Sequence, residues 1–194
     1  MSLVAESDSM AMRASSDLPL LTAEDVLQMS LPGKSVELVR GRLVVREPPS
    51  TKHGRIQANL TYFLGAFVRA HALGAVIGGA GFKIEEGPDT VRAPDVAFVS
   101  NARAGDIPNR SYAAFAPELV AEIVSPNDRA GEVLAKVADW LEASVRLVWV
   151  IDPQRDEARV HRADGSLGLI GSDGSLDGED VLPGFRVSLA DVLR

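Results

Sequence analysis

The sequence predicts an α/β fold of mixed α+β type, in which a mixed central β-sheet is flanked by helices. Two segments place apolar residues three and four positions apart, which is typical of helices with one buried face. Several short apolar runs separate and follow these segments, and such runs indicate strands. The chain of 194 residues is long enough for one well-buried core and short for two, so we expect a single domain over residues 19–194.

The first half of the chain is expected to form a short helix, a hairpin, a long helix and a strand. Thr-Ala-Glu-Asp from residue 22 has the form of a capping box and predicts a helix that ends near residue 29. Two apolar runs around an Arg-Gly pair predict a β-hairpin over 36–47. Helical spacing predicts the long helix over 52–71, and we expect 73–89 to be one glycine-containing strand that ends in a turn. The glycine cluster in this strand has the spacing of neither common phosphate-binding loop.

The second half of the chain alternates strands with one helix. A helix of about 15 residues is expected after the capping residues Asn127 and Asp128. Its predicted buried face consists of Val133, Leu134, Val137 and Leu141. Strands are expected over residues 96–99, 119–124, 145–152 and 157–162. The final region, residues 164–184, is expected to form hairpins or loops.

The composition excludes several kinds of site. The chain has no cysteine, which rules out disulfides, thiolate metal ligands and a cysteine nucleophile. Its three histidines are widely separated in sequence, which argues against a His-rich zinc site. The net charge of -7 argues against a protein that coats nucleic acid nonspecifically, although it leaves a local basic cleft open.

The sequence also lacks features of membrane and secreted proteins. No apolar run is long enough to span a bilayer, and the N-terminus lacks the apolar core of a signal peptide. We therefore expect a soluble, cytoplasmic protein with no membrane partner. Residues 1–18 are small, polar and aperiodic, and we expect them to form a disordered tail.

The strand expected over 119–124 contains a carboxylate, Glu122, among apolar neighbours, and Asp95 stands at the start of a second apolar strand. An ionised carboxylate inside a sheet is costly unless it is paired, hydrogen-bonded or bound to a cation. Two carboxylates near adjacent strands also repel each other. A divalent cation resolves both problems, and Mg²⁺ is typically held by one or two carboxylates plus waters. Asp95 and Glu122 are therefore candidate metal ligands, with Mg²⁺ or Mn²⁺ as the expected cofactor.

Lys136 lies on the helix that follows the Glu122 strand. If that helix packs back on the strand, the lysine side chain can reach the same cleft. A lysine there can stabilise charge on a pentavalent phosphate or orient the attacking water. Asp95, Glu122 and Lys136 together form a constellation for phosphodiester hydrolysis, in which a metal activates water and neutralises the leaving oxyanion.

Each of the three residues also has a structural interpretation. Asp95 follows a proline and can cap a turn. Glu122 can pair with an arginine in the core, and Lys136 can form a solvated pair with a glutamate one helical turn earlier. The partners in question are Arg92 or Arg146 for Glu122, and Glu132 for Lys136. Only the combination of the three favours a catalytic site.

Four segments follow one another along the chain: VELVRGRLVV, PPSTKHGRIQANL, RAPDVAFVS and PELVAEIVSPNDRAGEVLAKVADWLEASVRLVWVIDP. In order and spacing they resemble the Uma2-type restriction endonuclease family, also known as a domain of unknown function, within the PD-(D/E)XK nuclease superfamily. The resemblance covers roughly residues 20–190. It implies a restriction-endonuclease-like core, and it also implies a homodimer by analogy.

The resemblance assigns roles to particular residues. The family's PD falls on Pro94-Asp95, its E-x-x-S on the segment from Glu122 to Ser125, and its helix lysine on Lys136. Many superfamily members instead carry the lysine two residues after the acid, where this chain has valine. Trp140 stands where the family usually has tyrosine, and we expect it to pack behind the lysine.

Two further residues match the family pattern. Glu37 matches an acid near the site that can contact metal or water, and His53 matches a histidine that can touch phosphate or act in proton transfer. Glu37 can equally be a surface residue on its hairpin, and His53 can serve only to cap the long helix. His161, on a late alternating strand, is expected to be structural or exposed.

The sequence thus predicts a Mg²⁺- or Mn²⁺-dependent endonuclease, a hydrolase of phosphodiester bonds in nucleic acid, with DNA as the expected substrate. The alternative is a catalytically silent nuclease-like fold that binds nucleic acid or protein. The acidic net charge and the lack of an evident basic, aromatic-studded surface favour this alternative. The two hypotheses differ in whether basic residues converge on the Asp95/Glu122 cleft, the candidates being Lys52, Arg55, Arg92 and Arg129.

Overall fold

The structure is a computed structural model that describes residues 19–29 and 31–194. The disordered tail predicted over residues 1–18 lies outside the described residues. The helices are α2 (Ala23–Gln28), α3 (Thr51–Ala70), α4 (Asn101–Ala104), α5 (Ala130–Glu142) and α6 (Leu189–Leu193). The strands are β1 (Ser35–Val39), β2 (Arg42–Arg46), β3 (Gly74–Gly78), β4 (Phe82–Glu85), β5 (Thr90–Arg92), β6 (Val96–Ser100), β7 (Leu119–Ile123), β8 (Leu147–Asp152), β9 (Glu157–Arg162), β10 (Leu167–Ile170), β11 (Ser175–Asp177) and β12 (Arg186–Ser188).

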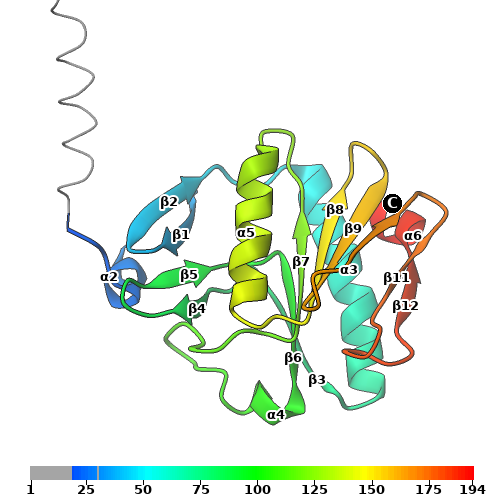
Figure 1. Ribbon diagram of the computed structural model, residues 1–194, viewed down its shortest axis with the longest axis horizontal. Coiled ribbons are helices and arrows are strands. Elements are labelled where there is room, and N and C mark those ends of the chain that lie inside the picture. The colour runs from blue at the N-terminus through cyan, green and yellow to red at the C-terminus, as the bar shows by residue number, and fades with distance from the viewer. Residues whose placement is uncertain (1–18, 30) are drawn as a thin grey trace, which may run out of the picture.

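Six strands form the central sheet in the order β10-β9-β8-β7-β6-β3 (Figure 1). β7 and β8 pair in parallel, with Glu122 opposite Val150, and the other neighbours in this sheet pair antiparallel. The sheet is therefore mixed, as the sequence predicts. β7 and β8 are buried along their whole length, so the strand that carries Glu122 runs through the interior of the fold.

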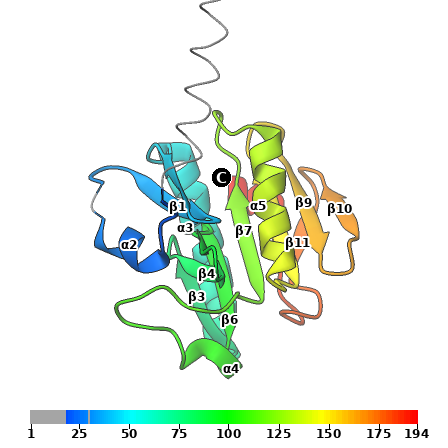
Figure 2. The ribbon, with the colours of Figure 1, turned by 60° about the vertical axis from the view of Figure 1, so that its left-hand side comes forward.

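Helices α3 and α5 cover opposite faces of the central sheet, and Figure 2 shows β7 between them. Side chains alternate between the two faces along a strand. Ile123 of β7 belongs to the core under α3, whereas Val120 packs with Val137 of α5. Glu122 has the same parity as Val120 and therefore points toward α5, the helix that carries Lys136.

A second sheet of four antiparallel strands, in the order β2-β1-β5-β4, lies beside the central sheet (Figure 1). The predicted hairpin forms β1 and β2, and its turn residues Arg40 and Gly41 both have positive φ. The predicted capping box of α2 is also present, with Thr22 and Asp25 bonded reciprocally. Glu37 lies on β1 of this sheet, and its side chain points toward α5.

The strand predicted over 73–89 is in fact two strands that belong to different sheets. β3 pairs with β6 in the central sheet, and β4 pairs with β5, a strand that the sequence did not indicate. Gly79, between them, has a φ of +63°, and a Cβ on Gly81 would lie 2.5 Å from the ring of Tyr112. These glycines let the chain cross from one sheet to the other, and hydrophobic periodicity carries no sign of such a crossing.

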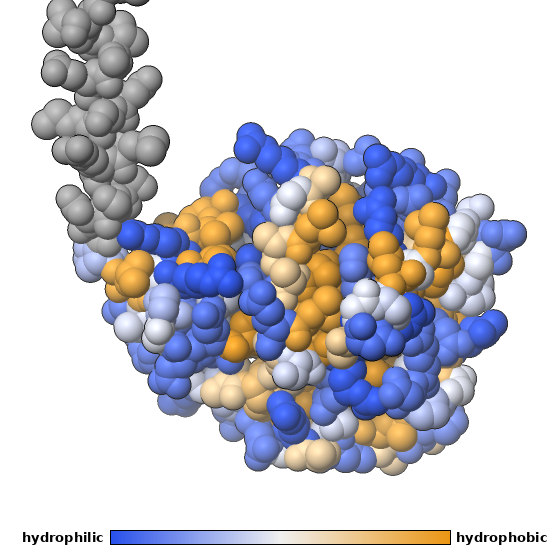
Figure 3. Space-filling view, in the orientation of Figure 1, coloured by the Kyte–Doolittle hydropathy of each residue, from blue (hydrophilic) through white to orange (hydrophobic). Residues whose placement is uncertain are grey.

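The start of α5 differs from the prediction. The N-cap is Arg129, whose side chain makes no capping hydrogen bond, and Asp128 instead accepts a hydrogen bond of 2.8 Å from the backbone N–H of Ser125. Leu134, predicted on the buried face, is 55% exposed, and Figure 3 shows a band of apolar residues over α5. Trp140 is fully buried beneath the helix.

The C-terminal region forms hairpins, as predicted: β10 pairs with β9, and β11 pairs with β12. Among the helices of residues 19–29 and 31–194, none is both long and apolar enough to cross a membrane.

Candidate functional site

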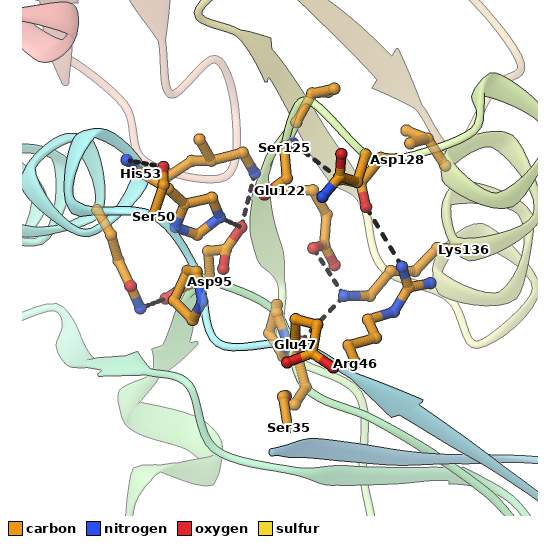
Figure 4. Close-up of a pocket in the computed structure, with 18 of the residues that line it drawn as sticks. Ser35, Arg46, Glu47, Ser50, His53, Asp95, Glu122, Ser125, Asp128 and Lys136 are labelled. Atoms are coloured by element: carbon orange, nitrogen blue, oxygen red, sulfur yellow. Dashed lines mark hydrogen bonds and ion pairs between the residues drawn. The ribbon is translucent and has the colours of Figure 1, made fainter. Parts of the chain in front are cut away.

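One pocket of about 580 Å³ brings the predicted site residues together (Figure 4). It lies where the β1–β2 hairpin, the first turn of α3, the residues before β6, the end of β7 and the first half of α5 meet. The predicted residues Glu37, His53, Asp95, Glu122 and Lys136 all line it. Other polar residues along its wall include Ser35, Arg46, Ser50, Ser125 and Asp128.

Glu122 is buried on the α5 side of β7 and has two charged or polar partners. Its Oε2 accepts a hydrogen bond of 2.8 Å from Nζ of Lys136, and its Oε1 accepts one of 2.8 Å from Nε1 of Trp140. Burial and the nearby carboxylates of Asp95 and Glu37 outweigh the attraction of Lys136 and raise the pKa of Glu122 to about 7.

Lys136 projects from the second turn of α5 into the pocket, where three oxygen atoms surround its ammonium group. Besides Glu122, Nζ contacts the carbonyl oxygen of Ala93 at 3.0 Å and Oε1 of Glu37 at 3.1 Å. Burial opposes the charged form, but the carboxylates of Glu122 and Glu37 outweigh it and raise the pKa of Lys136. Lys136 is therefore a fixed positive charge at neutral pH.

Glu37 is buried on β1, so the interpretation of it as a surface residue is wrong. Its Oε1 accepts a hydrogen bond of 2.9 Å from the backbone N–H of Ala93, and its Oε2 accepts one of 2.9 Å from Arg92. Burial raises the pKa of this carboxyl, but Lys136 and Arg92 outweigh burial and lower it. Glu37 thus stays ionised beside Lys136.

Asp95 stands directly before β6 and links it to β7. Its Oδ2 accepts a hydrogen bond of 2.7 Å from the backbone N–H of Ile123 and lies 3.2 Å from Nε2 of His53. The carboxylate therefore contacts a neighbouring strand rather than capping a local turn. Its placement next to the end of β7 puts it in the same pocket as Glu122.

His53 is buried in the first turn of α3. The N-cap of α3 is Ser50, whose hydroxyl accepts from the backbone N–H of His53 at 3.3 Å, so the histidine side chain is not the cap. Burial lowers the pKa of His53, but Asp95 outweighs burial and raises it. Nδ1 of His53 meets no hydrogen-bond partner among the described residues.

The sequence matches the family model Uma2, described as "Putative restriction endonuclease", over residues 23–190. The chain belongs to the Uma2 family. Among solved structures it is similar to the crystal structure of "a putative nuclease belonging to DUF820" from Anabaena variabilis, with a TM-score of 0.75 and 18% identity. The alignment covers 89% of this chain and 97% of that chain, which shows a shared fold and confirms the predicted fold class. No curated protein matches the chain.

In this Uma2 chain the predicted structural partners of Glu122 and Lys136 are engaged elsewhere. Arg92 pairs with Glu37 and Asp139, and Arg146 pairs with Asp180. Glu132, the predicted partner of Lys136, instead pairs with Arg46. Glu122 and Lys136 are thus each other's partners across the interface between β7 and α5.

The basic residues expected to converge on the cleft do not line it. Lys52 donates to the carbonyl of Pro153, and Arg55 donates to that of Leu193. Arg92 is buried behind Glu37, and Arg129 also lies outside the lining. Of the lysines and arginines in the described part of the chain, Arg46 and Lys136 line the pocket. Sequence reasoning missed Arg46, because an arginine that alternates with valines on a hairpin has the pattern of any exposed strand residue.

His161, predicted to be structural or exposed, lies on β9 outside the pocket and is partly buried. Trp140, predicted to pack behind the lysine, is fully buried and donates a hydrogen bond from its indole N–H to Glu122. That contact was not foreseen, since an indole at a helical core position normally indicates packing alone.

The metal that the family implies has a limited set of candidate ligands. Over residues 19–29 and 31–194, no group of three or more His, Cys, Asp or Glu side chains is arranged to hold a metal ion. Two of the carboxylates that line the pocket are the predicted ligands: Asp95, whose Oδ1 receives no hydrogen bond from the described residues, and Glu122, both of whose oxygens are bonded. Mg²⁺ needs only one or two carboxylates and keeps several waters, so this donor set fits the ion in kind.

Proposed function

We propose that the protein is a divalent-metal-dependent endonuclease that hydrolyses phosphodiester bonds in nucleic acid, with Asp95 and Glu122 as ligands of Mg²⁺ or Mn²⁺. The contact of 2.8 Å between Glu122 and Lys136, in a pocket that also contains Asp95, carries the proposal. Two carboxylates beside a fixed ammonium group are the side chains that hydrolysis of a phosphodiester requires. The description of the Uma2 family as "Putative restriction endonuclease" supports it and makes DNA the first substrate to test.

The charge of the pocket supports a metal requirement. Two permanent cations, Arg46 and Lys136, line it together with six carboxylates: those of Glu37, Glu47, Asp95, Glu122, Asp128 and Glu132. A phosphodiester is an anion, and this excess of negative charge repels it. A divalent cation between Asp95 and Glu122 would neutralise the phosphate and lower the pKa of a bound water.

The residues of the chain have separate tasks in the proposed reaction. A water oxygen attacks phosphorus, the bridging P–O bond breaks, and the leaving oxygen takes up a proton. Lys136 faces the phosphate and stabilises its developing charge, while Glu37 keeps the ammonium group protonated and in place. His53 holds the Asp95 carboxylate in orientation, and that carboxylate raises the pKa of the imidazole.

A cleavage assay tests this function. Supercoiled plasmid, single-stranded DNA and RNA are incubated with Mg²⁺ or Mn²⁺ and with wild type, Asp95→Ala or Lys136→Ala. We expect cleavage by wild type and its loss in both variants, with circular dichroism showing that each remains folded. Lys83→Ala is the matched control, because Lys83 also pairs with a buried carboxylate, that of Asp89 at 3.2 Å, but lies outside the pocket.

A catalytically silent nuclease-like fold that binds nucleic acid or protein is the second candidate function. The observation that favours it is the failure of the four basic residues to line the pocket. In that case wild type cleaves none of the three substrates under any metal condition. Cleavage that persists in Asp95→Ala and Lys136→Ala would also count against the proposed mechanism, since it would point to a contaminating nuclease.

Two further features remain predictions. The homodimer implied by the family resemblance is testable by light scattering of the purified chain. The cytoplasmic location is testable by fractionation of the source cells.

A further inference from the structure

Arg46 at the end of β2 lies in the same pocket as Asp95, Glu122 and Lys136, and the reaction described above does not use it. Its guanidinium group reaches across the pocket from the second sheet to α5 (Figure 4). With 32% of its side chain exposed, Arg46 is the more accessible of the two permanent cations in the lining, because Lys136 is 14% exposed and held by three oxygens.

The contacts of Arg46 are long. Its Nη1 lies 3.3 Å from Oδ1 of Asp128 and 3.6 Å from Oε2 of Glu132, and its Nε lies 3.9 Å from Glu37. Arg92, by comparison, donates from Nε at 2.8 Å and from Nη1 at 2.9 Å to its two carboxylate partners. Each of the three guanidinium nitrogens of Arg92 thus donates a hydrogen bond, whereas Arg46 is held loosely between several acids.

The Nε–H of Arg46 is buried and has no hydrogen-bond partner among the described residues. An unsatisfied buried donor is unfavourable, and an incoming acceptor removes that cost. Nε–H and a neighbouring Nη–H form a planar fork, which matches two oxygens of one phosphate group. In the present side-chain position Nε is covered by protein atoms, so a phosphate at the mouth of the pocket would satisfy this donor once Arg46 turns away from Asp128 and Glu132.

We propose that Arg46 binds a backbone phosphate of the nucleic acid, and that Asp128 and Glu132 hold it in place until the substrate displaces them. The inference rests on the proposed function, because it assigns a substrate contact at the same site. In this exchange the phosphate takes the place of carboxylates that pair with Arg46 in the free protein.

The salt dependence of binding tests the proposal independently of catalysis. Binding of a short fluorescein-labelled DNA duplex is measured by anisotropy over a series of KCl concentrations, with Ca²⁺ in place of Mg²⁺ to prevent cleavage. Each phosphate contact contributes a slope of about -0.9 to the logarithm of the binding constant against the logarithm of the salt concentration. Arg46→Gln is expected to reduce the magnitude of the slope by about 0.9, and Arg186→Gln, on β12 outside the pocket, is expected to leave it unchanged.

A second variant approaches the contact from the other side and leaves Arg46 itself in place. Glu132→Gln removes a half-exposed partner of Arg46 and is expected to tighten binding, whereas the double variant Arg46→Gln/Glu132→Gln is expected to lose that gain. An unchanged slope in folded Arg46→Gln, or an equal gain from Glu132→Gln in both backgrounds, would overturn the role of Arg46 and leave the endonuclease proposal intact. If wild type neither binds nor cleaves any nucleic acid, both proposals fail.

Discussion

Nζ of Lys136 on α5 lies 2.8 Å from Oε2 of Glu122 on β7, and both side chains are nearly buried. The pair joins the central sheet to the helix that covers it. Glu37 contributes a second carboxylate to the same ammonium group from the neighbouring sheet. The three elements β1, β7 and α5 therefore depend on one buried positive charge, which makes the candidate site a structural junction as well.

Lys136→Met removes this charge and leaves two carboxylates in the interior. We expect the free energy of unfolding to fall by about 3–5 kcal/mol, because breaking a buried pair leaves an uncompensated charge. The measurement is urea unfolding at about pH 8, where most of Glu122 is ionised in wild type. Adding Glu122→Gln to Lys136→Met should recover part of the loss. Additive losses in the double variant would show that the two side chains do not interact.

The raised pKa of Glu122 predicts a pH dependence of stability. The unfolded glutamate titrates near 4.5 and the folded one near 7, so between these values the folded state binds more protons. The free energy of unfolding of the metal-free protein should therefore decrease as the pH rises from about 4.5 to 7. One pKa unit corresponds to about 1.4 kcal/mol, so this carboxyl alone contributes roughly 3 kcal/mol over that range.

His53 acts in the same direction, because its raised pKa also gives stability that is lost as pH rises through the folded value. Urea unfolding of wild type and of Glu122→Gln at pH values across this range separates the two groups. The free energy of unfolding should change less steeply with pH in Glu122→Gln than in wild type. An identical slope in both proteins would assign the whole pH dependence to other groups.

The local features of the site were predictable from sequence because each one depends on its immediate neighbours. An acid within an apolar run marks Glu122, and Lys136 lies on the helix that directly follows this strand and can pack back on it. The parity of β7 then directs Glu122 to α5. The pairing of these two residues follows from a strand and helix adjacent in sequence.

The contacts made by the second sheet were not predictable in the same way. Glu37 reaches Lys136 only because the β1–β2 hairpin packs against α5, and Arg92 belongs to a strand of three residues that has no periodicity to detect. Arg46 lies opposite Asp128 and Glu132, which are more than 80 residues away in sequence. Contacts over such separations depend on the crossing between sheets at Gly79–Gly81, and local sequence pattern does not encode it.

Asp95→Asn should lower the pKa of His53. Asp95 supplies the hydrogen bond and the charge that raise this pKa, whereas burial of the imidazole lowers it. NMR titration of the imidazole protons of His53 in wild type and in Asp95→Asn measures the change. His161 is an internal reference, because burial and Arg159 set its lowered pKa, and Asp95 takes no part. A shift of equal size at His161 would indicate a global change of structure instead.

Variants of Trp140 can separate two contributions to stability: the hydrogen bond of its indole to Glu122 and the packing of its ring. Trp140 and Trp149 are both fully buried, but Nε1 of Trp140 donates to Oε1 of Glu122 at 2.8 Å, whereas Nε1 of Trp149 meets no acceptor among the described residues. Trp140→Phe and Trp149→Phe each remove one ring, and only the first leaves a buried carboxylate oxygen unbonded. Trp140→Phe should therefore lower the free energy of unfolding at about pH 8 by about 1–3 kcal/mol more than Trp149→Phe does.

Tyrosine tests the same contact by rescue. A phenol hydroxyl is a donor at the end of an aromatic ring, so Trp140→Tyr should be more stable than Trp140→Phe by a net hydrogen bond to a charged group, about 1.5–3 kcal/mol. The difference in stability between the two variants should decrease below about pH 5, where Glu122 is protonated and an oxygen without a hydrogen bond costs less. Equal stability of the tyrosine and phenylalanine variants at every pH would mean that Trp140 supports Glu122 by packing alone.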